Sequence, residues 1–282
     1  MIGDAYVGIS GWRYPPWRGT FYPKGLVQRR ELEYAASLLS SIEINGSFYA
    51  LQRPENYQHW YAETPEGFLF SVKGGRFITH MKKLRDVEIP LANFFASGVL
   101  ALADKLGPLL WQLPPMLGFD NERLGAFFDL LPRTTTEAAQ LARGHDERLT
   151  DRDWTATDAD RPLRHAVEIR HQSYLDPTFL TLLRDRDIAI VVADTAGKWP
   201  LLETVTSDFA YVRLHGDQEL YVSGYSDTAL DRWAGLLHGW RTGETTPDGR
   251  PRDVYVYFDN DVKVHAPYNA IDLARRLEAL AD

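Results

Sequence analysis

Eight short apolar segments, each ending in polar or ionisable residues, constrain the fold of this chain more than any other feature. A stretch with helical spacing follows most of them. This alternation is typical of a parallel (β/α)₈ barrel, in which each strand is followed by a helix. The predicted strands are Tyr6–Ser10, Ser41–Asn45, Phe68–Lys73, Pro108–Leu113, Ala166–Arg170, Ala189–Asp194, Ala210–His215 and Val254–Asn260.

The intervening segments predict the helices. Two adjacent prolines, Pro15 and Pro16, exclude a regular helix directly after the first strand. No linker, repeat or low-complexity tract divides the chain, so we expect a single TIM-like α/β domain over residues 1–282. The expected helices are Gln28–Leu39, Pro54–Glu63, Leu91–Leu106, Asn121–Leu131, Glu137–Arg143, Pro177–Arg186, a weak Leu201–Val205, Thr228–Trp240 and Tyr268–Leu280.

The amino-acid composition limits which binding partners and which cellular compartment we expect. The formal net charge of -8 disfavours broad attachment to nucleic acid or to an anionic membrane. There are no cysteines, which excludes disulfides, thiolate metal sites and cysteine nucleophiles. No signal-like segment opens the chain and no apolar run reaches membrane-spanning length, so we expect a cytoplasmic protein without a membrane partner.

Strand alternation predicts where the polar side chains point. In the second predicted strand Glu43 and Asn45 share one face, and the isoleucines occupy the other. The fifth and seventh strands repeat this pattern. Because barrel chemistry lies at the carboxyl ends of strands, the polar residues there predict one site. Its candidates are Glu43, Asn45, Lys73, Gln112, Glu168, Arg170, His171, Asp194, Arg213, His215, Asp259 and Asn260.

Two interpretations of these charges remain open. In one, Glu43 and Glu168 only neutralise buried cations, as part of a structural ion network. In the other, the charges contact a ligand. Aromatic residues in the predicted loops favour a ligand, since flat rings stack on bases or sugars and interleaved cations suit phosphates. Some of these rings could equally pin loops to the barrel. They are Trp12, Tyr14, Trp17, Phe48, Tyr49, Phe77, Tyr221 and Tyr225, and His80 lies among them.

Other motifs of catalysis are absent. The sequence contains no Gly-rich phosphate loop, no His-Glu-x-x-His helix and no Gly-x-Ser-x-Gly elbow. The carboxylates and histidines of the predicted site could ligate a divalent metal. Their spacing does not demand one, and the neighbouring Lys73, Arg170 and Arg213 would compete with it. We therefore expect no cofactor and no required metal.

Several motifs occur in order along nearly the whole chain. They are Gly8-x-Ser10-Gly11-Trp12-x-Tyr14-x-x-Trp17-Arg18-Gly19, Glu43-x-Asn45-x-Ser47-Phe48-Tyr49, Phe70-Ser71-Val72-Lys73 with Thr79-His80, Gly107-Pro108-Leu109-Leu110-Trp111-Gln112-Leu113-Pro114-Pro115, Val167-Glu168-Ile169-Arg170-His171, Tyr211-Val212-Arg213-Leu214-His215-Gly216 and Tyr257-Phe258-Asp259-Asn260-Asp261. In these motifs the chain resembles the YecE-like family, also called domain of unknown function 72. The resemblance implies a TIM-like barrel and no established reaction. Three positions depart from the family pattern: Asp259 replaces the usual asparagine, Tyr174 a tryptophan and Ile9 a threonine, and the first adds a carboxylate to the predicted site.

These observations favour an enzyme that acts on a phosphorylated or nucleotide-like small molecule by acid–base chemistry, such as hydrolysis. Glu43, Glu168 and His215 are the candidate proton carriers. The predicted partner is a small anionic ligand held by Lys73, Arg170 and Arg213. The alternatives are a nucleic-acid-binding barrel of endonuclease-like type and a non-catalytic ligand sensor. The remaining candidates would bind or orient the substrate: Trp12, Asn45, Tyr49, Gln112, His171 and Asn260.

Overall fold

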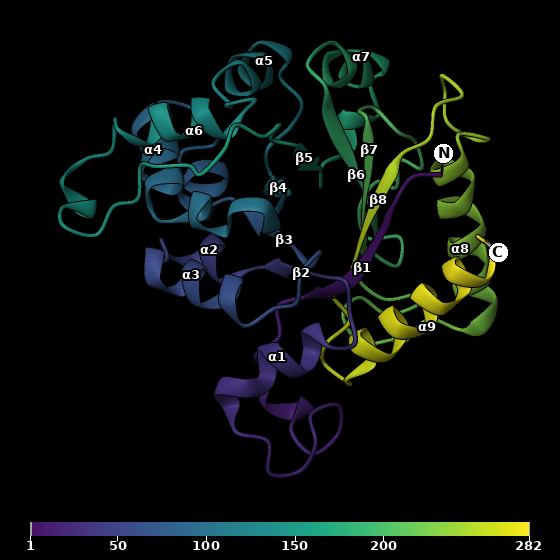
Figure 1. Cartoon of the computed structure of the whole chain (residues 1–282). Coiled ribbons are helices and arrows are strands. Elements are labelled where there is room, and N and C mark those ends of the chain that lie inside the picture. The colour runs from purple at the N-terminus through teal and green to yellow at the C-terminus, as the bar shows by residue number, and fades with distance from the viewer. Residues whose placement is uncertain (1, 282) are drawn as a thin grey trace. The chain divides into compact units, whose positions relative to one another are not determined.

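All eight predicted strands form, and they pair in chain order into one closed parallel barrel. Figure 1 labels each strand. The computed structural model describes residues 2–281. The prediction of a TIM-like α/β barrel is confirmed, and each observed strand overlaps its predicted segment. The strands are β1 (Ala5–Ser10), β2 (Ser41–Ile44), β3 (Leu69–Lys73), β4 (Leu106–Gln112), β5 (His165–Glu168), β6 (Ile188–Asp194), β7 (Phe209–Leu214) and β8 (Asp253–Phe258).

The helices begin where local chemistry favours it. Pro54 and Pro177 open two of them, and the side chains of Asp120, Asp176 and Ser226 accept hydrogen bonds from backbone N–H groups of the first turns. The α-helices are α1 (Glu31–Ala36), α2 (Gly46–Tyr49), α3 (Pro54–Ala62), α4 (Glu88–Ala96), α5 (Asn121–Asp129), α6 (Thr135–Ala142), α7 (Pro177–Asp185), α8 (Asp227–Thr242) and α9 (His265–Ala279).

Short helices of other types complete the connections. A π-helix spans Phe77–Met81 after β3. The 3₁₀ segments are Pro15–Trp17, Gln28–Arg30, Val99–Lys105, Glu147–Leu149 and Gln172–Leu175.

Two predicted helices are wrong in part or altogether. The helix expected over Leu91–Leu106 ends at Ala96, because Gly98 takes a left-handed conformation (φ 113°) and a 3₁₀ segment follows. The weak helix expected over Leu201–Val205 does not form, and that stretch is irregular. Neither difference removes a strand.

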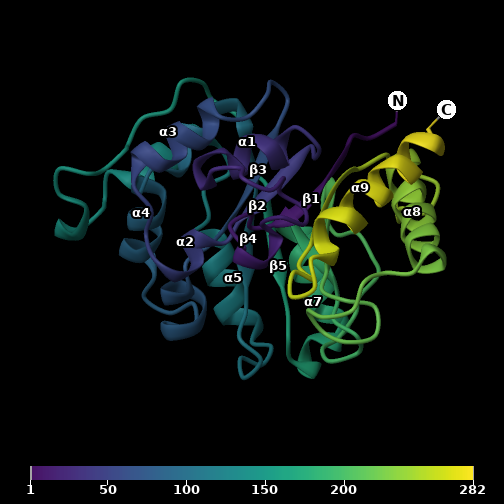
Figure 2. The same cartoon turned by 90° about the horizontal axis from the view of Figure 1, so that it is seen from below.

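The residues group into two compact units, each described here by itself. The first contains the chain up to Glu43 and from Ala189 onward, and the second is Ile44–Ile188. In the first unit α8 and α9 pack against each other, and α9 packs on β1 (Figure 2). In the second, α4 packs on α6, and the buried ring of Trp111 in β4 contacts Phe94 and Phe127. No helix within residues 2–281 has the length and apolar character that crossing a bilayer requires.

Candidate functional site

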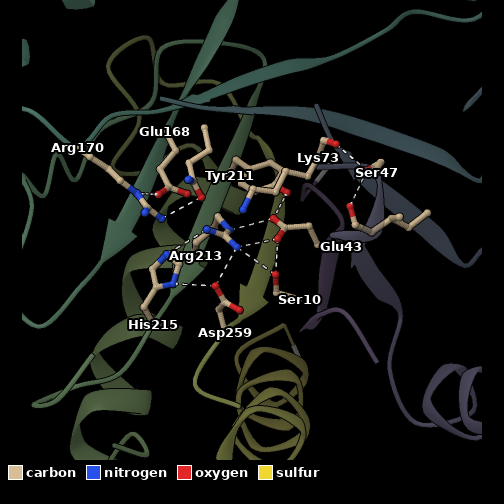
Figure 3. Close-up of polar contacts among 12 residues, drawn as sticks. Ser10, Glu43, Ser47, Lys73, Glu168, Arg170, Tyr211, Arg213, His215 and Asp259 are labelled. Atoms are coloured by element: carbon tan, nitrogen blue, oxygen red, sulfur yellow. Dashed lines mark hydrogen bonds and ion pairs between the residues drawn. The ribbon is translucent and has the colours of Figure 1, made fainter. Parts of the chain in front are cut away.

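In the first unit, the carboxylate of Glu43 is fully buried and fully hydrogen-bonded. Arg213 donates to it with two nitrogens, Nε to Oε2 at 3.0 Å and NH2 to Oε1 at 2.8 Å. Tyr211 donates its hydroxyl to Oε2 at 2.7 Å, and Ser10 donates to Oε1. A carboxylate has about four lone-pair positions, and this one uses all four (Figure 3). Glu43 therefore has no acceptor position left for a ligand.

The guanidinium of Arg213 contacts two further residues that follow the strand ends. Its NH2 lies 3.0 Å from Oδ2 of Asp259, and its NH1 donates to Nε2 of His215 at 3.2 Å. Since Nε2 accepts that hydrogen bond, a neutral His215 carries its proton on Nδ1. Nδ1 lies 3.0 Å from Oδ2 of Asp259, although the angle is too poor for a standard hydrogen bond.

We call these six residues the Arg213 network: Ser10, Glu43, Tyr211, Arg213, His215 and Asp259. Apart from Asp259, whose side chain is 16% exposed, they are buried. Burial and the charge of Glu43 raise the pKa of Tyr211 well above its usual value, so the phenol stays a donor. The mutual pairing of these groups matches the structural interpretation of the predicted charges better than a ligand-binding role.

Carboxylates after β8 and β6 lie beside this network. Burial, together with the nearby charge of Asp259, raises the pKa of Asp261 to about 6. The same causes raise the pKa of Tyr14, whose hydroxyl donates to the Ser10 carbonyl at 2.5 Å. Burial also raises the pKa of Asp194, which accepts a hydrogen bond from Tyr225 at 3.0 Å. A carboxyl group with a pKa near 6 can exchange protons close to neutral pH.

Replacing Asp259 with asparagine, the residue usual in the family pattern, should lower the pKa of Asp261. The substitution removes a neighbouring negative charge, while burial continues to hold this pKa above its ordinary value of about 3.9. The pKa of Asp261 is raised only in the folded state. The protonated carboxyl therefore contributes its full stabilisation of the fold below about pH 4, and this contribution is lost as the pH rises through about 6. The Asp259→Asn variant should show less of this loss.

The measurement is an NMR titration of the Asp261 carboxyl carbon, with pH-dependent denaturation as the second readout. The exposed Asp185→Asn variant controls for a general change in net charge and should leave the titration unchanged. An Asp261 pKa that stays at about 6 in Asp259→Asn would contradict the assignment of Asp259 as a cause.

In the second unit, one arginine connects two neighbouring strands. Gln112 of β4 and Glu168 of β5 are partners in the sheet register. Arg170 donates through Nε to Oε1 of Glu168 at 2.7 Å (Figure 3). It also donates through Nη2 to Oε1 of Gln112 at 2.9 Å. The carboxylate of Glu168 is buried, whereas the Arg170 side chain is 11% exposed. The Arg170 side chain is therefore partly exposed, and its guanidinium is held by residues of two strands.

Aromatic rings and further cations of the second unit lie in the segment that follows β2, at the end of β3 and just after it. The Nζ of Lys73 lies 4.5 Å from the centre of the Phe48 ring, and Ser47 donates to the Lys73 carbonyl at 2.6 Å. The Phe48 ring is perpendicular to that of Tyr49, with centres 5.1 Å apart. The guanidinium of Arg76 lies 5.7 Å from the centre of the Tyr49 ring. Tyr49 is 67% exposed, so much of its ring is open to solvent.

The pKa of His80 depends on the charges in this region. It belongs to the π-helix, hydrogen-bonds to Thr79 at 2.8 Å, and packs its ring edge-on against Phe48 at 5.1 Å. Burial lowers its pKa to about 4, assisted by the charges of Arg170, Lys73 and Arg76, with only Glu168 acting in the opposite sense. The charges of Arg170, Lys73 and Arg76 thus act on His80 in one direction and that of Glu168 in the other. We call Lys73, Arg76, His80, Glu168 and Arg170 the cation cluster.

The other predicted site residues have more local roles. Trp12 is buried, and its carbonyl accepts from Tyr22 at 2.6 Å. The Asn45 carbonyl accepts from the backbone of α2. His171 caps a 3₁₀ segment by accepting from the Ser173 backbone at 3.1 Å. The Nδ2 of buried Asn260 donates to the Ser223 carbonyl at 3.0 Å and to Asn269 at 3.1 Å.

Sequence reasoning missed two members of the Arg213 network. Tyr211 precedes Arg213 by two residues on the same strand, so strand alternation places both on one face. Ser10 is the sheet partner of Glu43, a register that no local pattern reveals. The expectation that all candidates belong to one site stays a prediction. Within residues 2–281, no group of three or more His, Asp or Glu side chains is arranged to hold a metal ion.

Comparisons with known proteins show sequence similarity to uncharacterised relatives. The chain is 28% identical to the UPF0759 protein YecE of Escherichia coli over 154 residues, which are 52% of this chain and 54% of that protein. It is 29% identical to the UPF0759 protein YunF of Bacillus subtilis over 127 residues, 42% and 43% of the two chains. These matches span about half the length of the two relatives.

Solved structures agree on the fold. A DUF72 family protein of Thermotoga maritima superimposes with a TM-score of 0.75 at 23% identity, covering 98% of this chain and 99% of that one. A DUF72 family protein of Enterococcus faecalis gives a TM-score of 0.71 at 17% identity, with 97% and 95% covered. The model of the family described as "protein of unknown function DUF72" matches residues 6–282. The chain therefore belongs to the DUF72 family.

Proposed function

We propose that this protein is an enzyme that acts on a phosphorylated, nucleotide-like small molecule by acid–base chemistry, and that the cation cluster binds its phosphate. The observation that carries the proposal is the placement of three cations: Arg170 is held by Glu168 and Gln112, Lys73 lies over the Phe48 ring, and Arg76 lies over the Tyr49 ring. A phosphate group would lower the electrostatic energy of this arrangement. The acidic net charge of the whole chain favours a compact anion over a polyanion.

Two cations of the cluster are suited to hold the phosphate. Arg170 is positioned by Glu168 and Gln112 and is partly exposed, and its planar group can bind an oxyanion through paired N–H donors. Lys73 adds a second charge beside the Phe48 ring. The exposed Tyr49 ring, with Arg76 over it, offers a stacking surface for a planar base. These features support a nucleotide over a simple sugar phosphate.

Glu168 is the base that we assign to the reaction. A phosphate that binds Arg170 competes with Glu168 for the same guanidinium, which weakens the ion pair and increases the proton affinity of the carboxylate. Glu168 would then accept a proton from a water molecule whose oxygen bonds to phosphorus, while the ester P–O bond breaks and the alcohol leaves with a proton. The products are inorganic phosphate and the alcohol. We assign Glu43 and His215 to the scaffold, since each is buried and hydrogen-bonded within the Arg213 network.

A ligand panel tests this proposal on the purified protein. Phosphate, ribose 5-phosphate and nucleoside monophosphates should raise the thermal midpoint, and each bound dianion should raise the pKa of His80 above about 4 in an NMR titration. Uncharged adenosine should do neither. Tyr49→Leu should weaken the binding of the nucleotides but leave the binding of ribose 5-phosphate unchanged. Glu168→Gln should retain nucleotide binding and lose the release of inorganic phosphate.

Several outcomes would count against the proposal. If no phosphate compound changes the midpoint or the His80 titration, the cation cluster is not an anion site. If only single-stranded DNA binds, with micromolar and strongly salt-dependent affinity, the nucleic-acid alternative replaces our choice. If phosphates bind but no nucleotide or sugar phosphate is turned over, the protein is a ligand sensor.

A further inference from the structure

A groove of about 540 Å³ lies in the first unit, at the amino end of β1 and thus at the opposite end of that strand from Ser10. The residues around Leu38 after α1 and those around Leu277 in the last turns of α9 form its sides. Much of its wall is apolar: Val7, Leu39 and Leu277 are buried there, and Leu38 is 46% exposed. A volume of this size falls within the range of small-molecule pockets.

One buried cation lines this groove. Arg241, in the last turn of α8, is only 8% exposed. Its Nε donates to the Gly3 carbonyl at 2.8 Å and its NH1 to the Leu277 carbonyl at 3.4 Å. Within the part of the chain that the structure describes, no carboxylate forms an ion pair with it. Burial lowers its pKa, and the nearby Asp4 acts in the opposite sense without reaching ion-pair distance.

An arginine that is buried without a paired carboxylate is unusual, because desolvation of a charge is costly. Main-chain carbonyls accept from two of its nitrogens, but they carry no net charge to balance it. Arg241 lines a groove whose walls combine apolar side chains, such as Leu38 and Leu277, with polar ones. Charge and surface together fit a molecule with an anionic head and an apolar tail.

We propose that this groove binds an amphiphilic monoanion, a carboxylate with a hydrocarbon chain. The carboxylate would pair with Arg241, and the chain would lie along Leu38, Leu39 and Leu277. Asp4 and Glu278 on the groove would repel a second negative charge, which favours a monoanion over a phosphate dianion. The groove shares no residue with the cation cluster, and the proposal does not depend on the proposed enzymatic reaction.

Arg241 could alternatively serve only to fasten the backbone at Gly3 and Leu277. The two roles differ in what they predict for neighbouring residues. If Arg241 only holds the backbone in place, the groove binds no ligand. A side chain that fills the groove would then change no binding affinity. A binding role makes affinity depend on free groove volume and on the charge of Asp4.

Calorimetry with octanoate, and with octanol as the uncharged analogue, tests the proposal on the full chain. We expect octanoate to bind and octanol to bind at least about tenfold more weakly. Ala274→Phe places a ring in the groove and should weaken octanoate at least about tenfold. Ala279→Phe, on an exposed position of α9 that does not line the groove, should leave affinity unchanged. Asp4→Asn should tighten binding about two- to fivefold by removing a competing acid.

Four results would overturn the proposal. They are no octanoate binding by the wild-type protein, equal binding of octanoate and octanol, unchanged affinity in a folded Ala274→Phe variant, and unchanged or weaker affinity in Asp4→Asn. Thermal melts establish whether each variant is folded. Since Asp4 is exposed, its substitution keeps the test decisive even where Ala274→Phe fails to fold.

Discussion

Truncation of Arg213 to alanine is expected to lower the free energy of unfolding by roughly 3–5 kcal/mol. The substitution leaves the buried carboxylate of Glu43 without the two nitrogens that neutralise it, at 3.0 and 2.8 Å. The ring of His215 and the carboxylate of Asp259 lose a partner as well. Urea denaturation at neutral pH measures the change, and a thermal melt should show a fall of about 10 °C.

A matched control and a double variant make the result specific. Arg29→Ala removes an exposed arginine and should change stability by less than about 0.5 kcal/mol. Replacing both partners, in Glu43→Leu with Arg213→Met, should destabilise less than Arg213→Ala alone, since no unpaired charge remains. Wild-type stability in Arg213→Ala, combined with loss of phosphate binding, would instead show that Arg213 is the ligand-holding cation expected from the sequence.

The barrel could be predicted from the sequence because its signals are local. Apolar runs that end in polar residues mark strands, and each strand lies within a few residues of its predicted place. Helix ends were less predictable. The segment expected to run as one helix from Leu91 is interrupted at Gly98, where a left-handed backbone redirects the chain and a Cβ atom would lie 2.5 Å from Pro54. That contact is tertiary, and no periodicity in the sequence contains it.

The sequence predicted which face of its strand each candidate residue occupies, but not how deeply its side chain is buried. Strand alternation gives the same inward phase to Arg213 and Arg170. The structure shows Arg213 buried among its partners, whereas 11% of the Arg170 side chain is exposed. Depth depends on register between strands and on the loops above them, which bring Ser10 to Glu43. Two arginines in similar sequence contexts therefore differ in their availability to a ligand.

The sequence likewise did not predict how burial and charge shift the pKa values of individual side chains. Both units contribute carboxylates and cations at the ends of their strands. In the first unit, burial and then the charges of Asp259 and Asp261 raise the pKa of Tyr14. In the second unit, burial and then the charges of Arg170 and Lys73 lower the pKa of His80. These shifts depend on burial and on distances within each unit, which the sequence does not contain.

Replacing Lys73 with methionine is expected to weaken the binding of phosphate esters by about 10- to 100-fold, the equivalent of losing one charge-assisted hydrogen bond worth roughly 1.5–3 kcal/mol. Methionine keeps most of the side-chain volume against Phe48 but removes the charge that lies 4.5 Å from that ring. Because Lys73 is one cause of the low His80 pKa, the same variant should raise that pKa above about 4.

Calorimetry with a nucleoside monophosphate and an NMR titration of His80 measure these two effects of Lys73→Met independently. Lys24→Met, which removes an exposed lysine of the first unit, should alter neither. If the His80 pKa rises while affinity is unchanged, Lys73 shapes the local field without contacting the ligand, and Arg170 is left to hold the phosphate. If neither quantity changes, the positive potential of the cation cluster does not originate from Lys73. If the affinity falls and the pKa of His80 rises, the charge of Lys73 both lowers the His80 pKa and contributes to ligand binding. That result is the one that supports the cation cluster as the phosphate site.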